Sequence, residues 1–303
     1  MPVPALLCLI LIGQPAPPPA NGPVPMPEYA RAFQAGDFAR AEALARARLA
    51  AQPADVQARI VAARSEAARG RFDAAYAGFR KALEIDPHSA DALYYLGITA
   101  GVLAQAEYER LLALAPGSAR AHQLLGLSYK AQEKTAEAEA ELTAALDAGP
   151  PTADVLVALG DLSRSKLAMA EARAYYTRAL ALAPASYDAL YGIGVCDSYA
   201  GDHAKAVSSF RQALRASPDS APALLALGIS LLQTAQPEAA VTELEHAVRL
   251  EPRMRQAYYH LGRVYRTLGR AHDAELAFAK VQQLIDEERR GAEQRLDPGP
   301  EPQ

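Results

Sequence analysis

The chain has very few of the residues on which disulfide-rich and metal-binding proteins depend. Its 303 residues include no Trp, two Cys and six His. Cys8 lies in an N-terminal apolar run and Cys196 in a helical pattern, so we expect no structural disulfide. The six His show no ligand spacing with Cys or with carboxylates, and no glycine-rich loop suited to a phosphate is present. We therefore predict no metal site and no cofactor.

Charge of one sign and long hydrophobic runs are also scarce. The formal net charge is −4, which argues against a general nucleic-acid binder. One apolar run, residues 5–12, is too short for a membrane span, which needs about 20 residues. Its length suits the core of a secretory signal, so we expect export to the periplasm or beyond if residues 1–20 act as a signal. A start at Met26 would instead make the protein cytoplasmic.

Proline is rare in the middle of the chain. Of the 22 Pro, nine fall in residues 1–27 and three in the last six residues. The ten between them interrupt a sequence rich in Ala, Leu, Arg and Glu, which are strong helix formers. This distribution predicts an all-α fold and argues against a β fold or a doubly wound α/β fold.

Several residue types recur at one fixed interval. Seven prolines are spaced by 34 residues with a single interval of 29, at Pro53, Pro87, Pro116, Pro150, Pro184, Pro218 and Pro252. A glycine keeps the same register at Gly97, Gly126, Gly160, Gly194, Gly228 and Gly262. A short polar residue follows each of the first six prolines by two positions, at Asp55, Ser89, Ser118, Thr152, Ser186 and Ser220. A shared period in this range predicts a repeat architecture.

Each recurrent residue has a physical role within a pair of helices. Proline lacks an N–H group and ends the second helix of a unit. The polar residue after it can accept hydrogen bonds from the first free amides of the next helix, so we predict that it is the N-cap. Glycine inside the first helix is unfavourable unless the paired helix comes close, and we expect the recurrent Ala at positions such as Ala138 and Ala172 to face it.

Whole units of the sequence resemble the tetratricopeptide repeat, a 34-residue helix–turn–helix. The clearest unit contains the family's pattern of Leu-Gly, aromatic, Ala, large apolar, Ala and Pro, at Leu125, Gly126, Tyr129, Ala138, Leu142, Ala145 and Pro150. The resemblance implies an α-solenoid of about eight repeats wound into a right-handed superhelix. It predicts a solenoid over residues 28–286, with units at about 28–53, 56–87, 90–116, 119–150, 153–184, 187–218, 221–252 and 255–286.

Four units and both ends depart from this pattern, and in the second unit Ala63 stands where the glycine is expected. Residues 1–27 are expected to form an apolar signal-like segment and a Pro-rich linker, and we expect the first half of the first unit not to be helical. The third unit is five residues short and is expected to lack the turn around Gly101. The eighth has Asp286 in place of proline, so its last helix is expected to continue into a charged extension and Pro-rich tail over residues 287–303.

In this family the first helices of successive repeats line a concave groove that binds partners. Carried over by repeat position, the resemblance implies a partner-binding groove formed by Tyr94, Tyr95, Ile98, Leu127, Lys130, Tyr191, Val195, Tyr199, Ile229, Tyr259, Arg263 and Arg266. Tyrosine and aliphatic side chains commonly anchor interfaces, although side chains at helical spacing also pack between neighbouring repeats. The carboxylate clamp of some family members requires an Asn, and the only Asn here is Asn21.

The leading hypothesis is a non-catalytic scaffold or adaptor that binds a peptide or helical segment of another protein. We predict no catalytic residues, because the repeats occupy almost all of the chain. One alternative is a structural protein that self-assembles into a homo-oligomer. Another is an assembly or regulatory factor of an envelope-associated complex.

Overall fold

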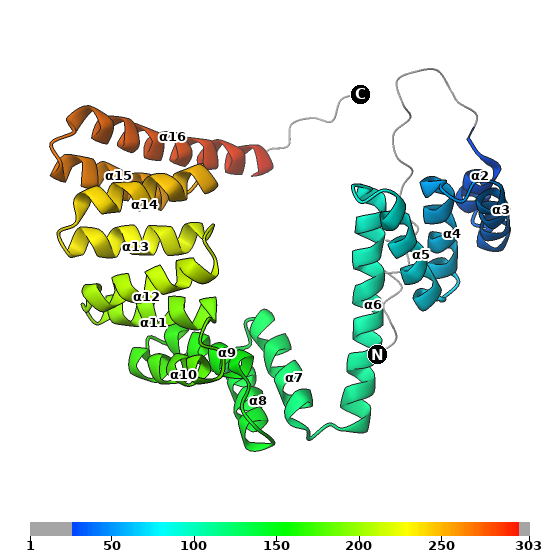
Figure 1. Ribbon diagram of the computed structural model, residues 1–303, viewed down its shortest axis with the longest axis horizontal. Helices are drawn as coiled ribbons and strands as arrows, with labels where there is room; N and C mark the ends of the chain where they lie inside the picture. Colours follow the sequence, from blue (N-terminus) through cyan, green and yellow to red (C-terminus); the bar gives the residue numbers. More distant parts are fainter. Residues whose placement is uncertain (1–25, 297–303) are drawn as a thin grey trace. The chain divides into compact units, whose positions relative to one another are not determined.

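The computed structural model describes residues 26–296, which form fifteen helices and no strand (Figure 1). The predicted signal-like segment up to residue 25 and the tail from residue 297 lie outside the described residues. Within residues 26–296, no helix combines the length and the apolar character that a membrane crossing requires. The all-α prediction is confirmed.

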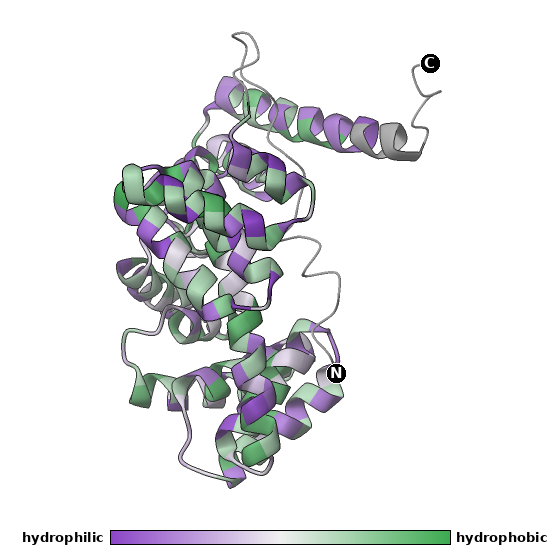
Figure 2. Cartoon of the chain, turned by 90° about the vertical axis from the view of Figure 1, so that its right-hand side faces the viewer, coloured by the Kyte–Doolittle hydropathy of each residue, from purple (hydrophilic) through white to green (hydrophobic). Residues whose placement is uncertain are grey.

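The chain divides into two compact units, which we describe separately. The N-terminal unit ends at Pro116 and contains α2 (Glu28–Gln34), α3 (Phe38–Ala51), α4 (Val56–Ala68), α5 (Phe72–Ile85) and α6 (Ala90–Leu114). The C-terminal unit begins at Gly117 and contains α7 (Ala119–Ala131), α8 (Thr135–Asp147), α9 (Ala153–Ser165), α10 (Met169–Leu182), α11 (Tyr187–Tyr199), α12 (His203–Ala216), α13 (Ala221–Gln233), α14 (Pro237–Leu250), α15 (Arg255–Thr267) and α16 (Ala271–Leu296). Hydrophobic and hydrophilic segments alternate along these helices, as expected for amphipathic helices (Figure 2).

Short polar side chains begin the first helices of the repeats, as predicted. In each case the side-chain oxygen accepts a hydrogen bond from the backbone N–H three residues later, at Asp55, Ser89, Ser118, Thr152, Ser186 and Ser220. The preceding helix ends before each repeat proline, for example at Leu182 before Pro184. The helix boundaries therefore follow from local hydrogen bonding at each end.

The first unit begins with a helix, so the prediction that its first half is not helical was wrong. The prolines stop at Pro27, which is the N-cap residue of α2. A proline before the first turn interrupts no helical hydrogen bond, because the first amides of a helix have no partner within it. Burial of Tyr29 and Phe33 stabilises this short helix.

The third unit contains one continuous helix, α6, instead of a pair. In the other units the turn between paired helices has one residue with positive φ, at Gly36, Gly70, Glu133, Leu167, Gly201, Ala235 and Gly269. The third unit has no such residue, so α6 continues through Gly101 to Leu114. The last helix is also long, and α16 continues past Asp286 as predicted.

The repeat glycines make room for a large side chain of the paired helix. A Cβ added at Gly194 would lie 2.5 Å from the ring of Phe210, and one added at Gly126 would lie 2.6 Å from Leu142. The close approach of the helices was predicted correctly, but the facing residue was not, because the nearest atoms belong to these large side chains and not to the recurrent alanines.

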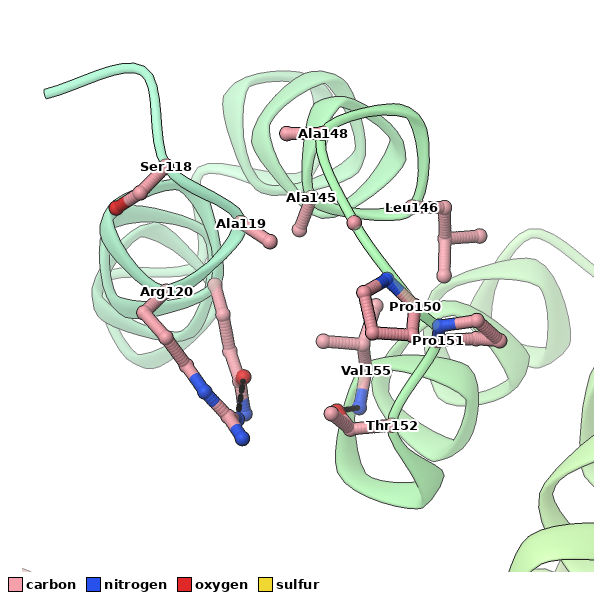
Figure 3. A pocket seen from close by; sticks show the side chains of 12 residues that line it. Ser118, Ala119, Arg120, Ala145, Leu146, Ala148, Pro150, Pro151, Thr152 and Val155 are labelled. Carbon is pink, nitrogen blue, oxygen red and sulfur yellow. Dashed lines mark hydrogen bonds between the residues drawn. The ribbon is translucent and has the colours of Figure 1, made fainter. Parts of the chain in front are cut away.

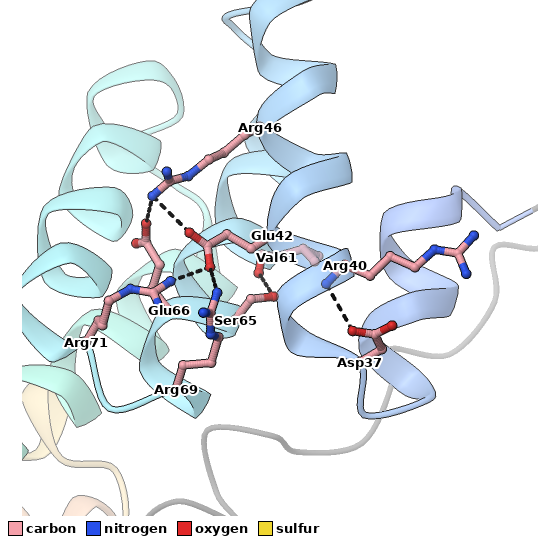
Figure 4. Close-up of polar contacts among 9 residues, drawn as sticks. All are labelled: Asp37, Arg40, Glu42, Arg46, Val61, Ser65, Glu66, Arg69 and Arg71. Carbon is pink, nitrogen blue, oxygen red and sulfur yellow. Dashed lines mark hydrogen bonds and ion pairs between the residues drawn. The ribbon is translucent and has the colours of Figure 1, made fainter.

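Ion pairs between buried glutamates and exposed arginines join the helices at the start of the N-terminal unit (Figure 4). The Glu42 carboxylate of α3 pairs with Arg46 at 3.0 Å, with Arg69 at 2.7 Å and with Arg71. Burial acts to raise the pKa of Glu42, but hydrogen bonds and charge from these arginines hold that pKa below its ordinary value. Arg46 also bonds Glu66 of α4 at 2.6 Å, so the network holds α3 against α4 and the turn that follows it.

Candidate functional site

The first helices of the C-terminal unit form a common face. Helix α9 contacts α11, α11 contacts α13, and α13 contacts α15, in addition to the contacts within each helix pair. We define the first-helix face as the side of the C-terminal unit that bears the predicted groove residues of these helices and α7. They are Leu127, Lys130, Tyr191, Val195, Tyr199, Ile229, Tyr259, Arg263 and Arg266.

These residues differ in how accessible they are. Tyr199 is 63% exposed and Tyr259 is 48% exposed, so both rings are free to contact another molecule. Tyr191 is half-buried and packs against the rings of Tyr187 and Phe210, with centroids 5.8 and 5.6 Å away. Val195, Ile229 and Lys130 are also half-buried, whereas Leu127 is exposed. The face therefore offers exposed aromatic rings above an apolar floor that is packed into the repeats.

The predicted groove residues on α6 belong to the N-terminal unit and do not share one environment. Tyr95 is only 7% exposed and stacks on Phe79 with ring centroids 5.8 Å apart. The guanidinium carbon of Arg64 lies 4.5 Å from the Tyr95 ring centroid and 4.4 Å from that of Phe33. Tyr95 is therefore a core residue, and its assignment to a binding surface was wrong. Tyr94 is exposed and Ile98 is half-buried.

A fully buried tyrosine of a second helix packs against the first helices beneath this face. Tyr176 of α10 places its ring against Gly160 of α9 and Gly192 of α11, both of which lack the Cβ that would occupy this space. Its hydroxyl donates a hydrogen bond to Asp161 at 2.7 Å and accepts one from Arg164 Nε at 3.2 Å. Burial raises the pKa of Tyr176 well above its ordinary value, so the hydroxyl stays protonated.

The charges next to this hydroxyl are paired. Asp161 also accepts a hydrogen bond from Lys130 Nζ at 2.5 Å and lies 3.5 Å from Arg164. The predicted site residue Lys130 thus joins α7 to α9. The sequence prediction missed Tyr176, although the off-register Gly192 was a signal that a side chain needed space there.

Basic side chains collect at the other end of the face. Arg263 and Arg266 are exposed on α15, and together with Thr267 they line an open hollow. Within residues 26–290, neither arginine has a carboxylate within ion-pair distance. Burial, and then the charge of Arg263, lower the pKa of the adjacent His260, so this imidazole is neutral at pH 7. The end of the face at α15 is therefore positively charged and able to receive an anion.

A separate pocket of about 340 Å³ lies between α7, α8 and the start of α9 (Figure 3). Its walls are mostly apolar and include Ala145, Leu146, Pro150 and Val155. At its edge Arg120 donates a hydrogen bond to Gln123 at 2.8 Å. The pocket holds no titratable pair suited to catalysis.

No cluster of three His, Cys, Asp or Glu side chains able to hold a metal ion occurs in the part of the chain that the structure describes. Cys196 is buried, and burial raises the pKa of its thiol above the ordinary value. A thiol in this state is a poor nucleophile.

Comparisons with known proteins give two matching family models. The tetratricopeptide repeat model matches residues 31–90, 103–153 and 123–186. The model of the cilia and flagella-associated protein 70 middle TPR-like domain matches residues 156–285. A search of curated proteins gave no match.

Solved structures of MamA are similar in fold. A crystal structure of MamA is 19% identical, with a TM-score of 0.51, and the alignment covers 55% of this chain and 97% of that chain. MamA 41-end from Desulfovibrio magneticus RS-1 is 20% identical, with a TM-score of 0.52, covering 56% of this chain and 96% of that chain. Similarity at this level of identity concerns the fold alone.

Proposed function

Since the chain belongs to the tetratricopeptide-repeat family, we propose that it is a protein-interaction scaffold that uses the first-helix face of its C-terminal unit. The proposed ligand is a helical or extended segment of another protein, held by apolar contacts with the exposed Tyr199 and Tyr259 rings. These two tyrosines carry the proposal, because large aromatic side chains anchor interfaces when a partner covers them. The proposal assigns the protein a role in binding, with no catalytic group.

The charge distribution of the face favours a ligand with an acidic end. Lys130 and Arg164 share the single carboxylate of Asp161, so these three groups together carry a net charge of +1. Arg263 and Arg266 have no such partner among the described residues and lie on the same helix as Tyr259. Carboxylates of the ligand would form charge-assisted hydrogen bonds with these arginines. The apolar part of the ligand would then extend toward α11.

Site-specific photocrosslinking in the source organism tests this proposal. The photoreactive residue p-benzoylphenylalanine replaces Tyr199 in one variant and Tyr259 in another. Both positions are expected to crosslink to the same partner protein. With that partner's segment purified, Tyr199→Ala with Tyr259→Ala is expected to raise Kd at least about tenfold, because two anchors are lost. Arg263→Ala with Arg266→Ala is expected to raise Kd and to remove most of its salt dependence, because the attraction to the acidic end of the ligand is lost.

The matched control places the photoreactive residue at Leu182 of the second helix α10, which is also an exposed large apolar position. No crosslink to that partner is expected there. Equal crosslinking at Leu182, or an unchanged Kd for the double Tyr variant with an unchanged circular dichroism spectrum, would contradict the proposed face.

A further inference from the structure

Helix α6 has two apolar seams on opposite sides, and the structure covers one of them. The covered seam consists of Ala92, Tyr95, Thr99 and Val102, all buried. A second seam with the same alternating spacing of three and four residues is shifted by two positions, which rotates it by about 200°. We call it the open seam, and it consists of Tyr94, Gly97, Gly101, Ala104, Tyr108 and Leu111.

The open seam contains the residues that in other repeats pack one helix against its partner. By repeat position, Gly97 corresponds to Gly194, and Tyr108 corresponds to Phe210. In the later repeat the ring of Phe210 is buried at Gly194. In α6, by contrast, Tyr108 is 46% exposed, and a Cβ added at Gly97 would meet no atom within 4 Å.

A flanking position behaves in the same way. Leu93 is 52% exposed, whereas its equivalents Leu156, Leu190 and Leu224 are buried. The interior of the third repeat is therefore complete in sequence but open in structure.

The interior of the third repeat stays open because the turn between its two helical segments is missing. Gly97 and Tyr108 are eleven residues apart on one straight helix, a separation of about 16.5 Å along the axis. A straight helix cannot bring them together. The five residues absent from this unit correspond to residues 131–135 of the next unit, which include the left-handed turn residue Glu133. A shortened hinge that blocks closure within one chain is the circumstance that favours exchange of elements between two copies.

We infer that a second copy of this chain completes the third repeat by pairing its α6 antiparallel to the first. If Gly97 of each copy lies opposite Tyr108 of the other, the register of the whole pair is fixed, because the residue numbers of any two facing residues then add up to 205. Leu93 then faces Leu112, and Tyr94 faces Leu111. Gly101 faces Ala104 beside the two-fold axis, where small residues allow two helices to come close.

The chemistry of the open seam matches this occupant. Each α6 supplies both the glycine gap and the ring that fills it, so the pairing is self-complementary, as a two-fold interface requires. The exposed parts of Leu93, Tyr94, Tyr108 and Leu114 amount to about 500 Å² per copy. A pair would bury about 1,000 Å², the lower size limit of a specific interface.

The mass of the native protein in solution gives the first test. Light scattering coupled to size exclusion at micromolar concentration is expected to give twice the mass of one chain, which is 32.2 kDa for the full sequence. Copying residues 131–135 into the chain after Gly101 restores the turn, so the repeat can close on itself, and this insertion variant is expected to be monomeric. A monomeric native chain, or an insertion variant that remains dimeric, overturns the inference.

A disulfide test fixes the register. In a background without Cys8 and Cys196, one preparation carries Gly97→Cys and a second carries Tyr108→Cys. Mild oxidation of the mixture is expected to yield the mixed covalent dimer, with little product from either preparation alone, because a disulfide needs Cα atoms within about 7 Å. Equal crosslinking within each preparation would indicate a different register or a non-specific contact, and would overturn the pairing described here.

Paired substitutions separate this interface from the proposed binding face. Tyr108→Glu is expected to give a monomer that still binds the partner segment, because Tyr108 is exposed and lies outside the first-helix face. Tyr199→Glu is expected to remain dimeric and to lose that segment. Loss of dimerisation in both variants would refute the assignment to α6, whereas failure of partner binding alone would leave it intact.

Discussion

The structural role of a glycine inside the first helix of a repeat depends on which side chain packs against it. At Gly194 the ring of Phe210 fills the space that a Cβ would occupy. At Gly97 nothing lies within 4 Å, since the third unit has no second helix. In the second unit the two roles are exchanged between helices: Ala63 replaces the glycine, and Gly78 of α5 supplies the space, because a Cβ there would lie 2.8 Å from that of Ala63.

We predict opposite effects of Gly→Ala at two positions of the same register. Gly194→Ala is expected to lower the free energy of unfolding by about 1–2 kcal/mol, because overpacking outweighs the gain in helix propensity. Gly97→Ala, placed in the monomeric Tyr108→Glu background, is expected to raise it by about 0.5–1 kcal/mol. Urea unfolding followed by circular dichroism measures both. Equal signs at the two positions would show that close packing is not the reason for the repeat glycine.

At the scale of the helix, the N-cap side chain fixes where a first helix begins, because it accepts a hydrogen bond from the backbone N–H three residues later. Ser186 caps α11 and Thr152 caps α9, each accepting a hydrogen bond from a backbone N–H that has no partner inside its helix. The proline two residues earlier keeps the preceding helix from running on. Where the turn residues are absent, as in α6, two helical segments fuse into one.

The cap of α11 provides a test at this scale. Ser186→Ala is expected to lower the free energy of unfolding by about 1 kcal/mol, because one N-terminal amide loses its acceptor. Ser186→Asp is expected to retain the stability of the native chain, since a carboxylate also accepts this hydrogen bond. The midpoint of thermal unfolding reports both variants. Failure of Asp to restore the midpoint would mean that Ser186 acts through packing and not as a cap.

At the scale of the whole chain, stability is local to neighbouring repeats. Each unit has its own buried residues: Phe79 lies in a core formed by α4, α5 and α6, and Phe210 in one formed by helices from α12 to α16. In a repeat protein the free energy is approximately a sum over repeats and their nearest neighbours. The two compact units are therefore expected to unfold separately.

Two matched substitutions test this separation. Phe210→Ala is expected to lower the stability of the C-terminal unit by about 3–5 kcal/mol and to leave the N-terminal unit unchanged, and Phe79→Ala is expected to do the reverse. Native-state hydrogen exchange resolves the two units within the full chain. A loss of protection in both units from either single substitution would show instead that the chain unfolds as one cooperative whole.

The sequence by itself determined α3 to α16 and their order, because proline, N-cap and turn residues act within three or four residues along the chain. It also named Tyr199, Tyr259, Arg263 and Arg266 as candidates for a binding groove through their repeat positions, and the structure exposes these four side chains. The helix at Glu28–Gln34 escaped prediction because the prolines before it were taken to extend their effect into it.

Only the tertiary structure decided which side chains are buried. Tyr94 and Tyr95 are adjacent in sequence, yet one is exposed and the other stacks on Phe79, since burial depends on which helix packs against which face. Likewise, the buried ring of Tyr176 fits between the first helices α9 and α11 only because Gly160 and Gly192 have no side chains there. Such contacts join residues far apart in the chain, and no local pattern specifies them.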